Sequence, residues 1–169
     1  MNTKTKKIVT AALLSALTCV VTMTIKVPSP LKGYLNLGDG IVLLIGWILS
    51  PAYGFLSAGI GSAMADIFSG YVIYAPATFV IKGTMAVLAF YGFKLLNKKL
   101  NVTFSKIISG VLAEIFMVLG YFGFEGILYG FVPSVVNIPA NAIQGIAGIV
   151  IGVVLVKVFE KNGKFMDSL

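Results

Sequence analysis

The sequence predicts an all-α membrane protein with six transmembrane helices and both termini in the cytoplasm. Three observations support this: the composition, the lengths of the apolar segments and the positions of the lysines. The 169 residues are 58% hydrophobic and 11% charged, with a mean hydropathy of +0.98. Soluble domains carry about 25% charged residues, and about a third of the surface of an unfolded chain this long stays exposed after folding. The composition therefore excludes a soluble enzyme, a disordered tail and a disulfide-stapled secreted domain.

Six apolar segments follow one another along the chain. A helix needs about 20 apolar residues to cross about 30 Å of hydrocarbon, and four segments approach or exceed that length: 8–25, 75–96, 107–124 and 135–159. The stretch between the first two is divided at Ser50-Pro51, because proline suits the first turn of a helix and restricts the residue before it. We expect two helices there, 38–49 and 52–69, the first short for an upright crossing. The chain 1–169 is then one membrane domain.

The lysines set the orientation, because short cytoplasmic loops carry an excess of positive residues. With the N-terminus in the cytoplasm, ten lysines lie on that side: Lys4, Lys6, Lys7, Lys94, Lys98, Lys99, Lys106, Lys157, Lys161 and Lys164. Only Lys26, Lys32 and Lys82 lie toward the outer side. The net charge of +7 is therefore spread over three cytoplasmic edges. Nucleic acid is not expected as a partner, because it would need one basic patch.

Several residue types and motifs are missing from the sequence. The chain has no His, which removes the commonest metal ligand and general base. Its single cysteine, Cys19, allows no disulfide within the chain. No G-x-x-x-x-G-K-[ST] loop is present, so an ATP-driven step requires another chain. We expect no catalytic residue, no metal site and no cofactor.

Three ionisable residues fall inside the predicted spans, where such residues are rare and normally functional. Asp66 and Lys82 lie near the outer ends of neighbouring helices. They either form a salt bridge with each other or line an outward-facing site. Glu114 falls near the middle of the fifth helix and either serves a site or makes a polar contact between helices.

Amides and tyrosines gather toward the outer side. Asn137, Asn141 and Gln144 are spaced i, i+4, i+7 and so share one face of the last helix. Amides both donate and accept hydrogen bonds, which suits a neutral polar ligand, although bonds between helices are the alternative. The outer stretches 26–37, 70–76 and 122–133 carry aromatic residues that form either a belt at the membrane interface or, where the stretches converge, a lid. The candidates for stacking on a flat heteroaromatic ring are Tyr34, Tyr74 and Tyr121.

Small residues form smooth faces on two helices. Ala12 and Ala16 are spaced i, i+4 on the first helix, and the third helix is rich in Gly, Ala and Ser over 54–65. Such faces allow helices to approach closely. They serve either internal packing or docking of another protein.

Taken together, the motifs resemble those of the substrate-binding S components of energy-coupling-factor (ECF) vitamin transporters. The resemblance is carried by GYLNLGD at 33–39, SPAYG at 50–54, GIGSAMAD at 59–66, YAPATFVIKG at 74–83 and IPANAIQG at 138–145, with Ala12-x-x-x-Ala16 matching the family's docking motif. The subgroup that it resembles takes hydroxymethylpyrimidine or pyridoxine-type substrates.

The resemblance implies a non-catalytic subunit in a prokaryotic plasma membrane, with a vitamin site near the outer surface. Its implied partners are a transmembrane coupling subunit, two ABC-type ATPases and membrane lipid, and transport would occur by toppling of the S component in the bilayer. Lys26 and Lys32 in the lid depart from this pattern and suggest an anionic vitamin. Alternatives are an S component for riboflavin or pantothenate, and a self-assembling channel subunit, which would need a polar face along a whole helix.

Overall fold

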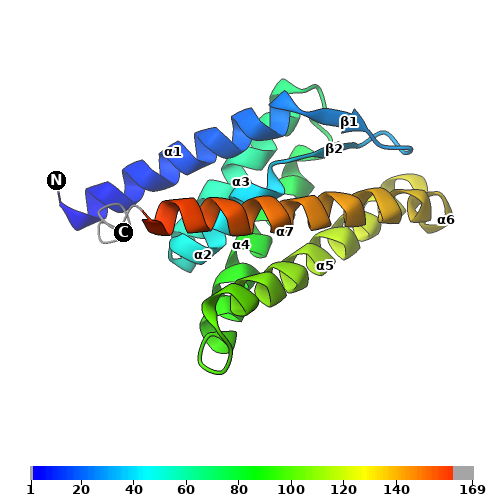
Figure 1. Ribbon diagram of the computed structural model, residues 1–169. Coiled ribbons are helices and arrows are strands. Elements are labelled where there is room, and N and C mark those ends of the chain that lie inside the picture. Colours follow the sequence, from blue (N-terminus) through cyan, green and yellow to red (C-terminus); the bar gives the residue numbers. More distant parts are fainter. Residues whose placement is uncertain (1, 162–169) are drawn as a thin grey trace.

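The computed structural model describes residues 2–161 and is mostly helical (Figure 1). Its helices are α1 (Thr3–Thr24), α2 (Asp39–Ile48), α3 (Pro51–Phe68), α4 (Ala75–Leu96), α5 (Val102–Tyr129), α6 (Phe131–Ser134), the 3-10 turn η1 (Val135–Asn137) and α7 (Ile138–Lys161). Two short strands, β1 (Lys26–Pro28) and β2 (Tyr34–Asn36), pair as an antiparallel hairpin. The predicted helical class is confirmed. Lys164 lies outside the described residues.

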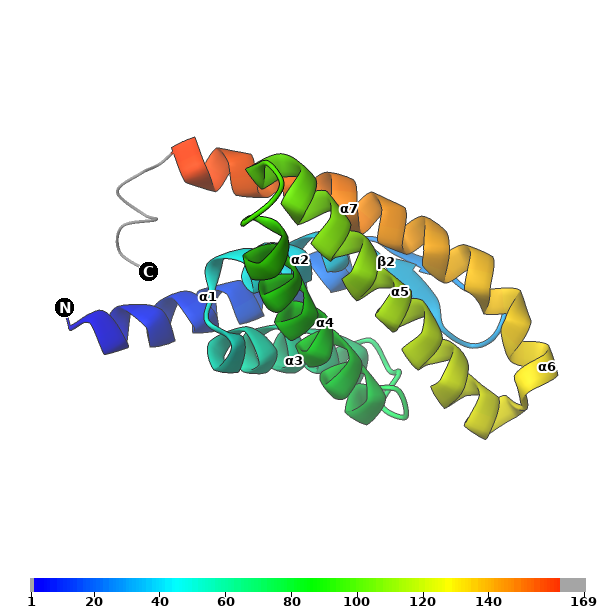
Figure 2. The same cartoon turned by 90° about the horizontal axis from the view of Figure 1, so that it is seen from below.

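Four helical stretches within residues 2–161 are long and apolar enough to cross a membrane: Lys4–Thr24, Ala75–Leu96, Val102–Tyr129 and Phe131–Lys161. The helix α2 is apolar but has only 10 residues, so its shortness was predicted correctly. The start of α1 and the end of α7 lie at one end of the molecule, and the hairpin and α6 lie at the other (Figures 1 and 2).

Two outer stretches differ from the prediction. The segment 26–37 forms a hairpin rather than an irregular loop, closed by a hydrogen bond of 2.9 Å from the Ser29 amide to the Gly33 carbonyl. The segment from 122 onward was predicted to be a loop, but α5 continues through it to Tyr129. A Cβ at Gly126 would clash with the ring of Phe131, so this glycine gives Phe131 the room to fold back against α5.

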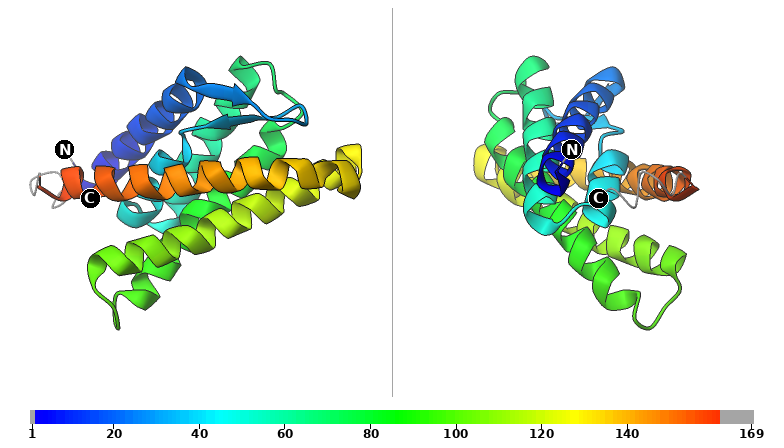
Figure 3. Two further views of the ribbon diagram at one scale, coloured as in Figure 1. Left: turned by 45° about the vertical axis from the view of Figure 1, so that its right-hand side comes forward. Right: turned by 90° about the vertical axis from the view of Figure 1, so that its left-hand side faces the viewer.

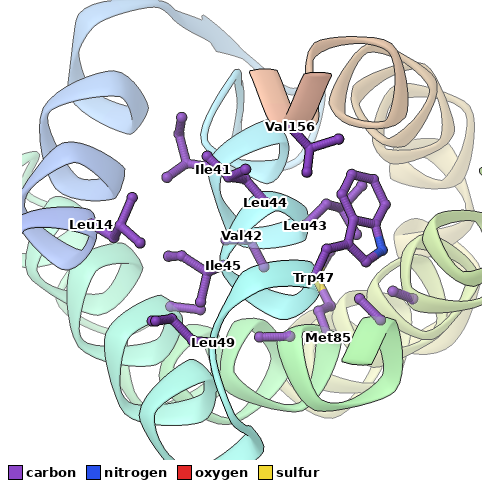
Figure 4. Packing of buried hydrophobic residues seen from close by; sticks show 14 of the residues in the cluster. Leu14, Ile41, Val42, Leu43, Leu44, Ile45, Trp47, Leu49, Met85 and Val156 are labelled. Atoms are coloured by element: carbon purple, nitrogen blue, oxygen red, sulfur yellow. The ribbon is translucent and has the colours of Figure 1, made fainter. Parts of the chain in front are cut away.

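The short helix α2 forms the centre of the molecule. Every residue from Asp39 to Trp47 is buried, and apolar side chains from several neighbouring helices surround it (Figure 4). Figure 3 shows α1 and α3 on one side of α2 and α7 on the other. The indole Nε1 of Trp47 donates to Ser109 Oγ on α5 at 3.0 Å, which satisfies the one polar atom of this large side chain.

A glycine sets the distance between α2 and α4. An ideal Cβ at Gly46 would lie 2.6 Å from the carbonyl oxygen of Ala86 and 2.8 Å from the Cβ of Ala89. The Ala86 oxygen belongs to the backbone, so it cannot rotate away from an added Cβ. The two helices therefore pack at a separation that only glycine permits.

A buried ion pair joins the same two helices. The Lys82 ammonium on α4 donates to Asp39 Oδ1 on α2, and their side chains are 3% and 0% exposed. The second oxygen, Asp39 Oδ2, accepts a hydrogen bond of 2.7 Å from Gln144 Nε2 on α7. The predicted alternative of a salt bridge between Lys82 and Asp66 is wrong: the start of α2 carries the carboxylate nearest to Lys82.

We predict that Gly46→Ala lowers the unfolding free energy by about 1–3 kcal/mol, the usual cost of overpacking a filled core. The matched control is Gly123→Ala, because nothing lies within 4 Å of the Cβ that this change adds. Thermal unfolding in detergent should show a lower midpoint for the first variant only. Equal midpoints would contradict the close approach of α2 to α4.

We also predict that Lys82→Met destabilises the protein by about 3–5 kcal/mol, because it leaves Asp39 buried without its counter-ion. The double variant Asp39→Asn, Lys82→Met removes both charges and should recover much of that loss. The measurement is again thermal unfolding in detergent. A double variant no more stable than Lys82→Met alone would show that the charge pairing is unimportant.

Candidate functional site

A small polar cavity lies between the hairpin and the ends of four helices. Its volume is about 30 Å³, room for one or two water molecules. The lining comes from the hairpin, α3, α4, α5 and α7, together with the residue before α4: Ser29, Gly33, Tyr34, Asn36, Asp66, Tyr74, Thr78, Tyr121, Glu125, Asn141 and Gln144. Sites for small molecules usually measure about 300–1,000 Å³, so the structure shows this cavity closed.

Two amide side chains hold the hairpin over the cavity. Asn137 Oδ1 accepts from the Leu31 amide, and its Nδ2 donates to the Leu31 carbonyl, both at 3.2 Å. Gln144 Oε1 accepts from the backbone amide of Asn36 at 2.9 Å. The hairpin is therefore fixed through its backbone by residues that lie more than 100 positions later in the chain.

Each of two carboxylates in the lining accepts hydrogen bonds through one oxygen. Tyr34 donates its hydroxyl to Asp66 Oδ1 at 2.6 Å. Asn137 Nδ2 and the Tyr74 hydroxyl donate to Glu125 Oε1 at 2.8 and 3.3 Å. Within the described residues, Asp66 Oδ2 and Glu125 Oε2 are buried and have no hydrogen-bond partner.

Tyr34 and Tyr74 remain hydrogen-bond donors at neutral pH. Burial, and then the neighbouring charge of Asp66, raise the pKa of Tyr34 above its usual range. Burial also raises the pKa of Tyr74, with hydrogen bonding to Tyr129 and the charge of Glu125 adding to it. Ionisation of either hydroxyl would place a phenolate beside a carboxylate.

Aromatic rings cover one side of the cavity. The ring centroids of Tyr34 and Tyr71 are 4.6 Å apart, and those of Tyr71 and Tyr74 are 6.4 Å apart. Tyr121 shares a 3.0 Å hydrogen bond with Thr78, and its ring centroid lies 5.4 Å from the Lys82 ammonium. Flat rings beside free acceptors are suited to a flat polar molecule.

The structure brings six of the nine predicted site residues into the lining: Tyr34, Asp66, Tyr74, Tyr121, Asn141 and Gln144. The other three do not line the cavity. Asn137 lies in η1, before α7 begins, and anchors the hairpin. Lys82 is engaged by Asp39, and Glu114 lies in a separate apolar groove of about 310 Å³ between α5 and α7.

Three important residues were not predicted as site residues. Thr78 follows Tyr74, and Glu125 follows Tyr121, each by four positions, so that each pair shares one helix face. The spacing of Tyr121 and Glu125 could have predicted that both side chains line the site if α5 had been expected to extend past residue 124. Asp39 stands at the start of an otherwise apolar helix, where a carboxylate also favours the helix N-terminus.

A larger apolar groove lies between α1 and α3 and contains both predicted docking alanines, Ala12 and Ala16. Its volume is about 690 Å³, and its other lining residues are Ile8, Ala11, Ser15, Cys19, Val20, Tyr53, Leu56, Ser57, Ile60, Gly61, Met64 and Phe68. Ser57 donates to the Ala11 carbonyl at 2.7 Å and fixes the two helices together.

Among the described residues, no group of three or more His, Cys, Asp or Glu side chains is placed to hold a metal ion.

Comparison with known proteins gives the family. Residues 2–161 match the sequence model of the ECF-type riboflavin transporter, S component. The chain is 25% identical over 164 residues to the thiamine precursor transporter HmpT of Lactococcus lactis subsp. cremoris (strain MG1363). This alignment covers 96% of this chain and 92% of that protein. It is 37% identical over 135 residues to an uncharacterised protein of Pyrococcus woesei, covering 79% of this chain and 87% of the other.

Solved structures agree with this assignment. The S component of a bacterial ECF transporter superposes with a TM-score of 0.72 at 25% identity, over 96% of this chain and 98% of the other. The S component for biotin from an ECF-type ABC transporter superposes with a TM-score of 0.65 at 18% identity, over 94% and 92% of the two chains, which shows a shared fold. The chain belongs to the S component family of ECF transporters, a family of non-catalytic membrane proteins.

Proposed function

We propose that this protein is the vitamin-capturing subunit of an ECF importer in a prokaryotic plasma membrane. The observation that carries the proposal is the closed polar and aromatic cavity beneath the hairpin. In this proposal six helices span the membrane, both termini are cytoplasmic and the hairpin faces outward. The lysine distribution supports that orientation.

The favoured substrate is a pyridoxine- or hydroxymethylpyrimidine-type vitamin. A small flat ring bearing hydroxymethyl groups matches a site built from tyrosines, an amide and carboxylates. The similarity to a thiamine precursor transporter supports the same choice. Riboflavin, which the family description names, and pantothenate are the alternatives.

Loading of the site requires the hairpin to move. The cavity of about 30 Å³ has no room for a vitamin ring, so the bonds from Asn137 and Gln144 to the hairpin backbone must loosen. Three such hydrogen bonds are few enough to exchange with water. The hairpin therefore acts as the lid of the site.

Delivery requires partner proteins. We assign the apolar groove with Ala12 and Ala16 to docking on the transmembrane coupling subunit, whose two ABC-type ATPases supply the energy. The sequence has no phosphate-binding loop of its own. The small side chains let a partner helix approach the backbone of α1 closely.

Binding of tritiated pyridoxine, hydroxymethylpyrimidine, riboflavin and pantothenate to the detergent-purified protein tests vitamin capture. We expect one of them to bind at or below micromolar concentration. Asn141→Leu should weaken that binding about tenfold or more, because an amide that lines the cavity is lost while its shape is kept. The matched control, Asn97→Leu, changes an exposed amide far from the cavity. Absence of binding by every vitamin would refute the proposal.

Uptake into vesicles containing the protein, the coupling subunit and both ATPases tests docking. Ala12→Leu with Ala16→Leu should abolish uptake and leave vitamin affinity unchanged, because the added side chains fill the groove and not the cavity. Leu13→Trp adds similar bulk on an exposed part of α1 outside the groove and serves as the control. Uptake that persists in the double variant would place the docking surface elsewhere.

A further inference from the structure

We infer that the cavity selects a neutral or cationic heterocycle that donates hydrogen bonds to Asp66 and Glu125, and that it rejects vitamins carrying negative charge. The inference rests on the proposed function and specifies the substrate class. It assigns a recognition role to two carboxylates, of which Glu125 was not among the predicted site residues.

The first argument is the state of the two carboxylates. Asp66 and Glu125 are 5% and 2% exposed, and both line the cavity. Each accepts hydrogen bonds through one oxygen and leaves the other, Asp66 Oδ2 or Glu125 Oε2, buried and unsatisfied. A buried acceptor without a partner costs about 1–3 kcal/mol. A bound molecule with two donors removes both costs at once.

The second argument is that most of the protein's own donors near the cavity are already in use. Tyr34, Tyr74, Asn137 and Gln144 each donate to a carboxylate oxygen of this protein. The lining side chains left to donate are neutral: the Asn36 and Asn141 amides, the Ser29 hydroxyl and one hydroxyl of the Thr78–Tyr121 pair. The site therefore offers strong acceptors and only weak donors.

The third argument is that no lysine lines the cavity. Lys82 is engaged by Asp39. The Lys26 ammonium donates to Ser69 Oγ at 3.0 Å, and the Lys32 ammonium lies 5.9 Å from the ring centroid of Tyr129. With the hairpin in the position shown, the lid lysines thus do not supply the positive charge that an anionic vitamin needs. Protonating Asp66 or Glu125 would add a donor but still no positive charge.

An anion entering this cavity would lose its hydration without gaining a counter-ion, and it would meet two carboxylates. Hydroxymethylpyrimidine and pyridoxine satisfy both free oxygens through amino, ring N–H or hydroxyl groups. Riboflavin does so through its hydroxyls. Biotin and pantothenate each carry a carboxylate, so the fold shared with the biotin S component does not extend to its ligand.

Binding of matched pairs to the detergent-purified protein tests the inference. The pairs are pyridoxine with pyridoxine 5′-phosphate, hydroxymethylpyrimidine with its monophosphate, and riboflavin with riboflavin 5′-phosphate, together with biotin and pantothenate. We expect the member without phosphate to bind at least 100-fold more tightly in any pair that binds. Equal or tighter binding of a phosphorylated member, of biotin or of pantothenate overturns the inference and leaves vitamin capture standing. Failure of every compound to bind overturns the proposed function.

Isosteric variants show whether the two carboxylates cause the selectivity. Asp66→Asn and Glu125→Gln should each weaken binding of the neutral vitamin about tenfold or more and reduce its preference over the phosphorylated partner. The preference is a ratio within one sample, so it does not depend on how much of a variant folds. Glu114→Gln, which removes a buried carboxyl outside the cavity, is the matched control and should keep the wild-type ratio. An unchanged ratio in both Asp66→Asn and Glu125→Gln contradicts the assignment.

Discussion

The arrangement of this protein depends on one buried carboxylate, Asp39. It stands at the first position of α2, accepts the Lys82 ammonium from α4 and the Gln144 amide from α7, and is fully enclosed. A lone charge there would be prohibitive in an apolar interior, so the three helices must meet in one register. Gln144 then has its other amide atom free to hold the backbone of Asn36 in the hairpin. The packing of the membrane core and the closure of the cavity thus share a single side chain.

The buried polar residues of the molecule differ in how completely they are hydrogen-bonded. Asp39, Lys82 and Gln144 satisfy one another, and they make the fold specific. Asp66 and Glu125 line the cavity, and each has hydrogen-bond partners on one oxygen only. Glu114 also has no partner on either oxygen among the described residues, but it lies in the groove between α5 and α7, so incomplete hydrogen bonding marks a recognition residue only where the residue also lines the cavity.

The sequence predicted the helices well, because long apolar runs bounded by proline, glycine and lysine leave few alternatives. It predicted α2 as short for the same reason. It failed at the end of α5, where 122–133 was expected to be an outer stretch but the helix continues to Tyr129 and Gly126 leaves room for the ring of Phe131. The pairing of Lys82 was also wrong, because a contact between residues 43 positions apart depends on how helices rotate against one another. Asn137 and Gln144 were predicted as binding residues, but they bond to the backbone of the hairpin. Helical periodicity could not predict these contacts, because the hairpin itself was not predicted.

The length of α2 has a consequence for the work that transport requires. A helix of 10 residues rises about 15 Å, which is half of the roughly 30 Å of bilayer hydrocarbon. The hairpin and the cavity lie at the Asp39 end of this helix, because β2 ends at Asn36, just before α2 begins, and Asn36 lines the cavity. In the proposed importer, a vitamin held at this end of the short helix would have given up its water before any ATP is hydrolysed. The ATPases of the proposed importer would then not have to supply the free energy of dehydration, because binding has already met it.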